Sequence, residues 1–199
     1  MLDAVILDLG NVLVFHDNEV LFEQLARAFG TTVDSMRARI EKDIWERTNT
    51  GRLPGDSLRV ELQNSLGGAV TPERFAQLWN CHFTLNTPMI QRVEQLVGKV
   101  KLCLLSNTHD LHFLPLREQL PVLERFDGLV LSYEEGLMKP APELYRRALQ
   151  RVGVAPERAA FFDDIPRYAQ AATAVGIHGR VFTDVKSFDE QLALLGVAA

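Results

Sequence analysis

The residues AVILDLGN, numbers 4–11, set the fold and the chemistry of this chain together, because a short apolar run ends there in an acid, Asp8. A run of this length that stops at Gly and Asn is typical of a buried core strand rather than an amphipathic helix. Ligands of open α/β sheets bind just beyond the carboxyl ends of the strands. Asp8 therefore stands where such folds do chemistry, as a nucleophile, a metal ligand or a helix N-cap.

Apolar runs of the same kind recur further along the chain and alternate with segments of helical periodicity. This alternation predicts an α/β fold with a doubly wound parallel sheet and right-handed crossovers. The expected strands are residues 4–7, 100–105, 129–131, 159–162 and 180–182. The expected helices among the later strands are residues 111–120, 142–152, 167–175 and 187–195.

The alternation is interrupted between residues 15 and 85, where helical spacing replaces it and no strand is expected. Leu21, Phe22, Leu25 and Phe29, for example, form one apolar stripe. We therefore predict a helical bundle that is inserted after the first strand and covers the carboxyl ends of the sheet as a cap. The expected domains are a core of residues 1–14 and 86–199 and a cap of residues 15–85. The expected cap helices are residues 19–29, 33–47, 56–66 and 72–83.

Length and charge limit the classes of function. With 199 residues the chain is long enough for one sizeable core and a small accessory domain. Its net charge of −5 does not favour nucleic acid or an anionic membrane, so we expect neither as a partner. An anionic substrate must then be drawn by a local positive site. We expect a monomer or a weak dimer.

The cysteines and the N-terminus bear on the compartment. Cys81 and Cys103 stand in apolar surroundings without the spacing of a metal motif, so we expect both to be reduced core residues. The N-terminal apolar run is expected to be too short for a signal peptide or a membrane span. Both observations fit the cytosol, and a cytoplasmic location is predicted.

Polar side chains follow two of the later apolar runs. Ser106, Asn107 and Thr108 offer a hydroxyl, an amide and free backbone N–H groups at a strand end, which together can cradle an anion. The same residue types also favour ordinary turns. Lys139 stands before two prolines that fix where its side chain points, whereas a lone lysine is usually solvated.

Two adjacent acids, Asp163 and Asp164, close the apolar run at residues 159–162. They repel each other and cost stability without a counter-ion, and a hard cation such as Mg²⁺ takes oxygen ligands of this kind. A helix N-cap at Asp164 is the alternative, but it explains only one of the two acids. Together with Asp8, these residues are expected to meet at one edge of one sheet.

Four motifs now resemble, in order, those of the haloacid dehalogenase-like hydrolase superfamily: DLGNVL at 8–13, LSN at 105–107, KPAP at 139–142 and FDD at 162–164. The resemblance extends from residue 4 to about 182. It implies a Rossmann-like core, and the helical insert resembles the C1 cap of the phosphatase branch. The motifs are most similar to those of the α-glucose-1-phosphate phosphatases.

The resemblance also implies a function and a set of site residues. The function is that of a Mg²⁺-dependent phosphatase that hydrolyses a small phosphomonoester, with a sugar phosphate as one candidate, through an aspartyl-phosphate intermediate. Asp8 would be the nucleophile and Lys139 a second catalytic group. The phosphoryl oxygens would be held by Ser106, Asn107 and Lys139. The Mg²⁺ ligands would be Asp8, the backbone carbonyl of Gly10, Asp163 and Asp164.

Two positions depart from the family pattern. The second residue after the nucleophile is usually an Asp that protonates the leaving oxygen, and here it is Gly10. General acid catalysis is typically worth ~10²–10⁴-fold, so sugar 1-phosphates, which have better leaving groups, should be preferred. Tyr168 stands where the acidic motif usually continues with Asp or Asn, which weakens the surroundings of the metal. Candidates for the missing acid are His16, His109 and His112.

Several alternatives stay open. A 2-haloacid dehalogenase shares the cap and the nucleophile but needs no metal, and the acidic pair Asp163 and Asp164 argues against it. A non-catalytic phosphometabolite-binding protein is suggested by Gly10 and Tyr168. The cap residues expected to face the substrate are Trp45, Arg47 and His16.

Overall fold

The computed structural model describes residues 2–197. Its larger unit contains a five-stranded sheet in the order β5-β4-β1-β6-β7. Every neighbouring pair of strands in this sheet is parallel, which confirms the predicted α/β class. The strands are β1 (Ala4–Leu7), β4 (Lys101–Ser106), β5 (Gly128–Leu131), β6 (Ala159–Asp163) and β7 (His178–Val181).

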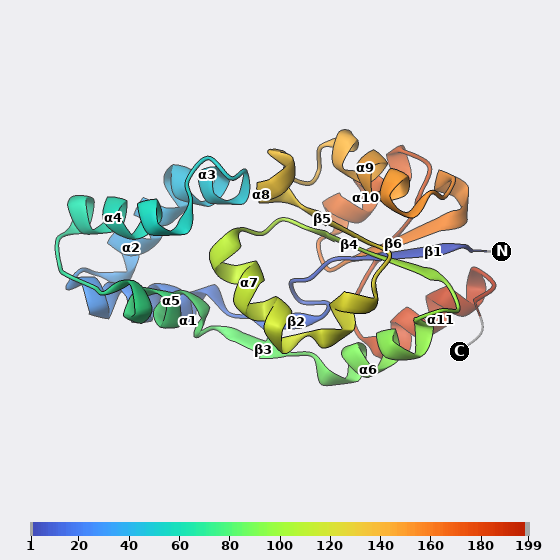
Figure 1. Cartoon of the computed structure of the whole chain (residues 1–199), viewed down its shortest axis with the longest axis horizontal. Helices are drawn as coiled ribbons and strands as arrows, with labels where there is room; N and C mark the ends of the chain where they lie inside the picture. The colour runs from blue at the N-terminus through green and yellow to red at the C-terminus, as the bar shows by residue number, and fades with distance from the viewer. Residues whose placement is uncertain (1, 198–199) are drawn as a thin grey trace.

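Helices cover both faces of this sheet (Figure 1). Because successive strand residues point to opposite faces, Val5 and Leu7 pack against one layer of helices, and Ala4 and Ile6 against the other. The first layer consists of α6 (Thr87–Leu96), α7 (Asp110–Gln119) and α11 (Val185–Leu194). The second consists of α9 (Pro142–Val152) and α10 (Pro166–Ala174). Burial on both faces explains why the central strands read as continuous apolar runs.

The strand order makes β1 the topological switch point of the sheet. The chain passes from β1 to β4 and β5 on one side, and later crosses to β6 and β7 on the other side. Ligands bind in the crevice at the carboxyl ends of the strands where the order reverses. Asp8 follows β1 at this point, and Ser106 and Asp163 are the last residues of the two strands beside it.

Parts of the sheet unit differ from their prediction. The edge strand β7 lies at His178–Val181 rather than at 180–182, because its residues are partly exposed and lack a continuous apolar run. Helix α6 and the short α8 (Ser132–Glu135) were not predicted. The Asn86 side chain accepts the backbone N–H of Met89 and so starts α6 as an N-cap.

The smaller unit is a helical bundle with a core of its own, on the left of Figure 1. Phe22, Phe75 and Trp79 belong to an apolar cluster that is separate from the two clusters of the sheet. Thr32 and Thr71 begin two of the helices by accepting backbone N–H bonds with their side chains. A π-helical turn at Ile40–Ile44 joins α2 to α3, so the expected helix 33–47 is interrupted. The helices are α1 (Asn18–Phe29), α2 (Val33–Arg39), α3 (Trp45–Asn49), α4 (Gly55–Leu66) and α5 (Pro72–Asn80).

The expectation that residues 15–85 hold no strand is wrong. β2 (Val14–His16) and β3 (Phe83–Leu85) pair antiparallel where the chain passes between the two units, and His16 lies opposite Phe83. Helix α5 consequently ends at Asn80 rather than at 83. Strands of three residues are too short for their alternation to show in the sequence. We propose that the boundary between core and cap runs through this two-stranded ribbon.

The bundle contacts the sheet unit at the first turn of α7. Trp79 Nε1 donates to His109 Nε2 at 3.2 Å, and Asn80 Nδ2 donates to the Leu111 carbonyl at 2.9 Å. A Cβ atom on Gly51 would lie 2.3 Å from the carbonyl oxygen of Tyr133, so the loop after α3 meets the sheet unit at a distance that glycine alone permits. These contacts hold the bundle over the carboxyl edge of the sheet.

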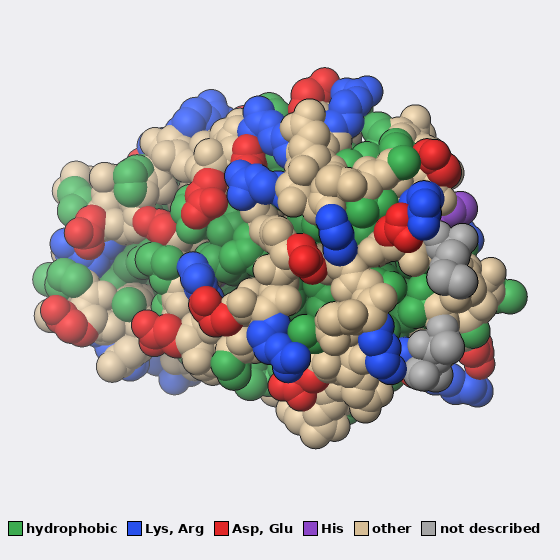
Figure 2. All heavy atoms as spheres, turned by 45° about the vertical axis from the view of Figure 1, so that its right-hand side comes forward, with side chains coloured by type: hydrophobic (Ala, Val, Ile, Leu, Met, Phe, Trp, Pro, Cys, Tyr) green, Lys and Arg blue, Asp and Glu red, His purple; other side chains and the backbone are tan. Residues whose placement is uncertain are grey.

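The burial of the two cysteines was only partly predicted. Cys103 is buried as expected, but Cys81 is exposed after the end of α5, so its assignment to the core is wrong. Across residues 2–197, no helix is long and apolar enough to cross a membrane. Figure 2 shows Lys and Arg side chains mixed with Asp and Glu on the face it presents, rather than gathered by sign.

Candidate active site

A cavity of about 350 Å³ lies between the carboxyl edge of the sheet and the bundle. The strand ends and their loops contribute Asp8, Ser106, Asn107, Lys139 and Asp164 to its lining. The bundle and the ribbon contribute His16, Trp45, Asn49, His82 and Phe83. The structure therefore brings together the residues that the sequence placed at separate strand ends, and it closes them from above with aromatic and amide side chains.

Asp8 and Lys139 form the charged centre of this cavity. Lys139 Nζ lies 2.8 Å from Asp8 Oδ1 and 2.6 Å from Asp163 Oδ2. The Lys139 side chain is only 1% exposed and the Asp8 side chain 10%. Burial alone would lower the pKa of Lys139, but the carboxylates of Asp8 and Asp163 raise it above its ordinary value. The ammonium group is therefore charged at pH 7, beside the acid that was predicted as nucleophile.

Three carboxylates converge beside Lys139. One oxygen each of Asp8, Asp163 and Asp164 lies within 4.8 Å of the other two. Burial raises the pKa of Asp163, and Lys139 opposes this shift. Asp163 Oδ1 also accepts the backbone N–H of Ile165 at 2.8 Å. Carboxylate oxygens in this arrangement are the donors that a hard divalent cation prefers, so the residues present fit a Mg²⁺ ion.

Asn11 is a site residue that the sequence analysis read only as part of a turn. Its backbone has a φ of +52°, a left-handed conformation that Asn adopts more readily than most residues. This conformation brings Asn11 Nδ2 to 2.9 Å from Asp164 Oδ2. Asn11 thus orients the acid on the metal side. The signal in the sequence was the Gly-Asn pair after the strand, which favours such a turn.

The Asn107 side chain holds the backbone of Lys139 with two hydrogen bonds. The Asn107 side chain accepts the Lys139 N–H through Oδ1 at 2.7 Å and donates to the Lys139 carbonyl through Nδ2 at 3.1 Å. The ring of Tyr168 lies 5.0 Å from Lys139 Nζ, and its hydroxyl lies 3.4 Å from Asn107 Nδ2. Tyr168 therefore packs against the lysine side of the cavity rather than among the three carboxylates.

Ser106 is buried at the end of β4 and lines the cavity. The loop that follows it is fixed by Ser132, whose hydroxyl accepts the Thr108 N–H and donates to the Thr108 carbonyl, each at 2.9 Å. This reciprocal pair fixes the direction of the backbone after Ser106, which is the segment predicted to cradle an anion.

His16 fills the space above Gly10. A Cβ atom built on Gly10 would lie 3.1 Å from His16 Nε2 and 3.2 Å from His16 Cδ2. A side chain at position 10 would thus point directly at the imidazole ring. The other two candidates, His109 and His112, are buried and hydrogen-bonded to Trp79, where the bundle contacts α7. Burial lowers the pKa of both, so each is a neutral ring at pH 7.

The wall opposite the sheet carries little charge. Trp45 and Asn49 come from α3, and His82 comes from the segment before β3. Burial lowers the pKa of His82 to about 4, so this ring too is neutral at pH 7. Arg167 stands exposed at the rim, with its guanidinium 4.8 Å above the ring of Tyr168. A molecule in this cavity therefore meets an uncharged wall and a charged floor.

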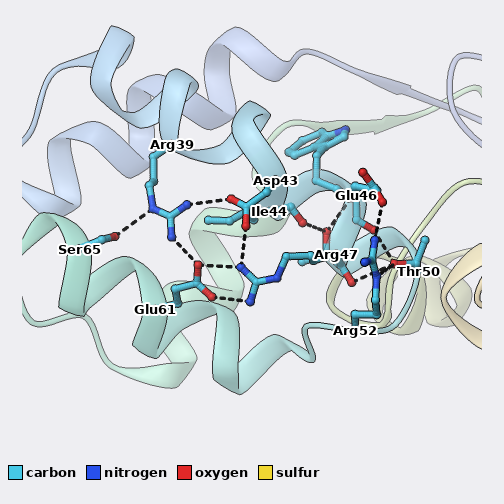
Figure 3. Close-up of polar contacts among 11 residues, drawn as sticks. Arg39, Asp43, Ile44, Glu46, Arg47, Thr50, Arg52, Glu61 and Ser65 are labelled. Atoms are coloured by element: carbon cyan, nitrogen blue, oxygen red, sulfur yellow. Dashed lines mark hydrogen bonds and ion pairs between the residues drawn. The ribbon is translucent and has the colours of Figure 1, made fainter.

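The prediction that Arg47 faces the substrate is wrong. Arg47 Nη1 lies 2.9 Å from Asp43 Oδ2, and Arg47 Nη2 lies 2.8 Å from Glu61 Oε2, in the ion-pair network of Figure 3. The bond to Glu61, and then the one to Asp43, raise the pKa of Arg47. Arg47 is absent from the lining of the cavity, while Trp45, two residues earlier on α3, belongs to it. Sequence spacing did not reveal which face of this short helix points inward.

Comparison with known proteins identifies relatives of this chain. A family model described as haloacid dehalogenase-like hydrolase matches residues 2–176. The chain is 29% identical over 185 residues to the sesquiterpene phosphatase astK of Aspergillus oryzae, and the alignment covers 91% of this chain and 90% of that protein. It is 26% identical over 174 residues to the D-ribitol-5-phosphate phosphatase of Bacteroides thetaiotaomicron. That alignment covers 82% of this chain and 84% of that protein.

The fold is similar to that of a solved enzyme from Bacteroides thetaiotaomicron, which was crystallised in complex with magnesium and inorganic phosphate. The TM-score is 0.83 at 23% identity, and the superposition covers 94% of this chain and 99% of that one. At this identity the likeness concerns the fold.

Proposed function

The chain belongs to the haloacid dehalogenase-like hydrolases, and on this basis we propose that it is a Mg²⁺-dependent phosphatase of small phosphomonoesters. One observation carries the proposal: the Asp8 carboxylate lies 2.8 Å from the Lys139 ammonium and within 4.8 Å of a carboxylate oxygen of Asp163 and of Asp164. A nucleophilic acid needs a cation on each side before it can approach a phosphate dianion. Lys139 is one of these cations, and the three acids provide the ligands for the other.

The reaction proceeds in two displacements at phosphorus. An oxygen of Asp8 attacks the phosphorus atom, the bond to the substrate's ester oxygen breaks, and the phosphoryl group is left on Asp8 as an acyl phosphate. Water then attacks the same phosphorus atom and returns Asp8 to its carboxylate form. Ser106, Asn107 and Lys139 bind the phosphoryl oxygens in both steps. Lys139 also orients Asp8, because it donates to Oδ1 from a buried position.

The charges require a divalent cation. Asp8, Asp163 and Asp164 carry three negative charges against the single positive charge of Lys139. Mg²⁺, held by Asp8, the Gly10 carbonyl, Asp163 and Asp164, would neutralise this excess and polarise the phosphoryl group when bound. Asn11 keeps the Asp164 carboxylate turned toward that position.

The substrate is proposed from the uncharged wall of the cavity. Trp45, Asn49 and His82 offer an aromatic face, an amide and a neutral ring, and Arg167, the one cation of the lining besides Lys139, stands at the exposed rim rather than on this wall. We infer that the organic part of the substrate is a neutral alcohol, and a sugar phosphate remains one candidate. The two relatives, a sesquiterpene phosphatase and a D-ribitol-5-phosphate phosphatase, support this class, since neither a sesquiterpene nor ribitol carries a charge. We also propose that the bundle is a C1 cap. Among the phosphatases, we propose that the motifs are most similar to those of the α-glucose-1-phosphate phosphatases.

A dehalogenase activity is the nearest rival. It would place a haloacid carboxylate beside Asp8, where Asp163 and Asp164 add negative charge. The test is a phosphatase assay with p-nitrophenyl phosphate and neutral alcohol phosphates, with Mg²⁺ or with EDTA. We expect turnover with Mg²⁺ and none with EDTA or in the Asp8→Asn variant. Halide release from 2-haloacids in EDTA without phosphatase activity would contradict the proposal, and so would inactivity on every phosphate.

A further inference from the structure

The amide of Asn49 is a buried polar group that the protein leaves unpaired. Asn49 is only 6% exposed and lines the cavity. Within residues 2–197 its side chain has no hydrogen-bond partner, whereas the side chains of Asn11 and Asn107 in the same cavity are bonded. Neither of its amide atoms is sealed from solvent in the way that Asn80 Oδ1 is, so the group opens into the cavity. Buried polar groups are almost always hydrogen-bonded, and here a molecule in the cavity must supply the bond.

A change of helical register brings Asn49 to the cavity. The π-helical turn before α3 ends with the Trp45 N–H donating to the Ile40 carbonyl, five residues back. Such a turn adds one residue to the register and rotates the face of the helix that follows. Trp45 and Asn49, four residues apart, consequently share the face that lines the cavity. Arg47 points away from this face and is held by Glu61 at 2.8 Å (Figure 3).

The segment around Asn49 is fixed from both sides. Thr48 Oγ1 donates to the Ile44 carbonyl at 2.9 Å, and the Gly51 N–H donates to the Thr48 carbonyl, also at 2.9 Å. Gly51 lies against the Tyr133 carbonyl, where a Cβ atom would be only 2.3 Å from the oxygen. The amide is thus preorganised, and a ligand that binds it does not have to order the chain first.

The chemistry of this wall fits a carbon chain that carries hydroxyl groups. The Asn49 amide accepts through Oδ1 and donates through Nδ2, which matches a hydroxyl group, itself a donor and an acceptor. Trp45, on the same face, offers apolar surface to the C–H groups between the hydroxyls. A hydrocarbon chain would instead cover the amide without a hydrogen bond, which is the less stable arrangement.

We infer, resting on the proposed function, that Asn49 determines substrate specificity by hydrogen-bonding a hydroxyl group that is remote from the phosphate. Asn49 comes from the bundle, whereas the groups assigned to the phosphate lie at strand ends and in their loops, so the amide meets the far part of the alcohol. The substrates of the enzyme are then phosphomonoesters of sugars or sugar alcohols rather than of hydrocarbon alcohols.

Two phosphates of five-carbon alcohols test whether remote hydroxyls are recognised. Ribitol 5-phosphate and 2-hydroxypentyl phosphate both carry a hydroxyl on the carbon next to the ester carbon, so their leaving oxygens have similar basicity. Only ribitol has further hydroxyls. With Mg²⁺ we expect the wild type to have a kcat/KM about tenfold higher, or more, on ribitol 5-phosphate. p-Nitrophenyl phosphate, assayed in parallel, reports the phosphatase reaction itself.

Asn49→Leu replaces the amide with an apolar group of nearly the same size. We expect kcat/KM to fall about 10–100-fold on ribitol 5-phosphate, because the remote hydroxyl loses its partner. On 2-hydroxypentyl phosphate and p-nitrophenyl phosphate it should change less than about threefold, which also shows that the variant is folded. Asn64→Leu, the same change at an exposed asparagine of α4 outside this cavity, is the matched control and should behave as wild type on all substrates.

The outcomes separate the role of Asn49 from the phosphatase reaction. A wild type that turns over p-nitrophenyl phosphate but does not prefer ribitol 5-phosphate would overturn the role of Asn49 while the phosphatase proposal stands. Equal losses on all substrates in Asn49→Leu, or full activity of this variant on ribitol 5-phosphate, would overturn it as well. Wild-type inactivity on every one of these phosphates with Mg²⁺ would overturn the phosphatase proposal itself.

Discussion

Lys139 Nζ lies 2.8 Å from Asp8 Oδ1 in a place where neither side chain is more than one-tenth exposed. A buried charge is stable only when its partner remains, so this pair makes the active site a determinant of stability as well as of activity. Asp163, which Lys139 also contacts, is wholly buried and depends on the same ammonium group.

Lys139→Met leaves Asp8 and Asp163 buried without their cation. We expect a loss of about 3–5 kcal/mol in the free energy of unfolding, measured with urea in EDTA, together with loss of phosphatase activity. Lys186→Met, an exposed lysine on α11, is the control and should change stability by less than about 0.5 kcal/mol. A Lys139→Met variant as stable as wild type would show that the pair does not bear on folding.

Mg²⁺ should stabilise the protein, because it relieves the repulsion among Asp8, Asp163 and Asp164. Binding only to the folded state adds about 2.7 kcal/mol at a concentration of 100 times Kd, which thermal unfolding detects as a higher Tm. Asp164→Asn should remove most of this increase, whereas Glu118→Gln, exposed on α7, should keep it. An equal Tm increase in Asp164→Asn would place the cation elsewhere.

Acid should weaken the contact between the helical bundle and α7, because this contact contains buried histidines. The rings of His109 and His112 lie 4.0 Å apart, and those of His82 and His112 5.2 Å apart. Burial lowers the pKa of all three, that of His82 from 6.5 to about 4. Below pH 6.5 these histidines take up protons in the unfolded chain but not in the folded chain. The free energy of unfolding is therefore highest above pH 6.5 and falls as the pH is lowered toward 4.

For His82, whose pKa is lowered from 6.5 to about 4, the effect is about 1.4 kcal/mol per pH unit between those two values. Urea unfolding at pH 7, 6 and 5 measures how steeply the free energy of unfolding changes with pH. His82→Phe should reduce this slope by the contribution of one histidine. His178→Gln should not change it, because His178 lies outside this cluster. If the wild type and His82→Phe have the same slope between pH 7 and 5, the pKa of His82 is not lowered in the folded state.

Trp45 and Arg47 lie two residues apart on α3 and allow a matched comparison. Trp45→Ala should raise KM about tenfold, a loss of about 1.4 kcal/mol in binding, because Trp45 lines the cavity. Arg47→Ala should leave KM unchanged and lower stability by about 1 kcal/mol, because its partners Asp43 and Glu61 lie in the partly exposed network. A higher KM in Arg47→Ala than in Trp45→Ala would reverse the orientation of α3.

Much of the sheet could be predicted, since its central strands are buried on both faces and appear as apolar runs. The residues at the ends of those runs, Asp8, Ser106 and Asp163, had to meet because parallel strands end at one edge of the sheet. Their grouping therefore followed from topology. The roles assigned to them, and to Asn107 and Lys139, stay predictions for the experiments described here.

The features that could not be predicted depend on contacts between distant segments, which local sequence patterns do not encode. His16 reaches Gly10 through the ribbon β2–β3, whose three-residue strands give no periodicity to detect. The side of α3 that faces the cavity is set by packing of the bundle, and so Arg47 was misplaced. Cys81 was assigned to the core from its apolar neighbours, but it follows the end of α5 and is exposed.

The central claim is that Asp8 carries the phosphoryl group during turnover. The direct measurement is to quench the enzyme in acid during turnover of p-nitrophenyl phosphate with Mg²⁺, reduce acyl phosphates with borohydride, and map the reduced residue by peptide mass. We predict reduction at Asp8 alone, and none in EDTA or in Asp8→Asn. Reduction at another acid, or turnover that persists in Asp8→Asn, would contradict the account.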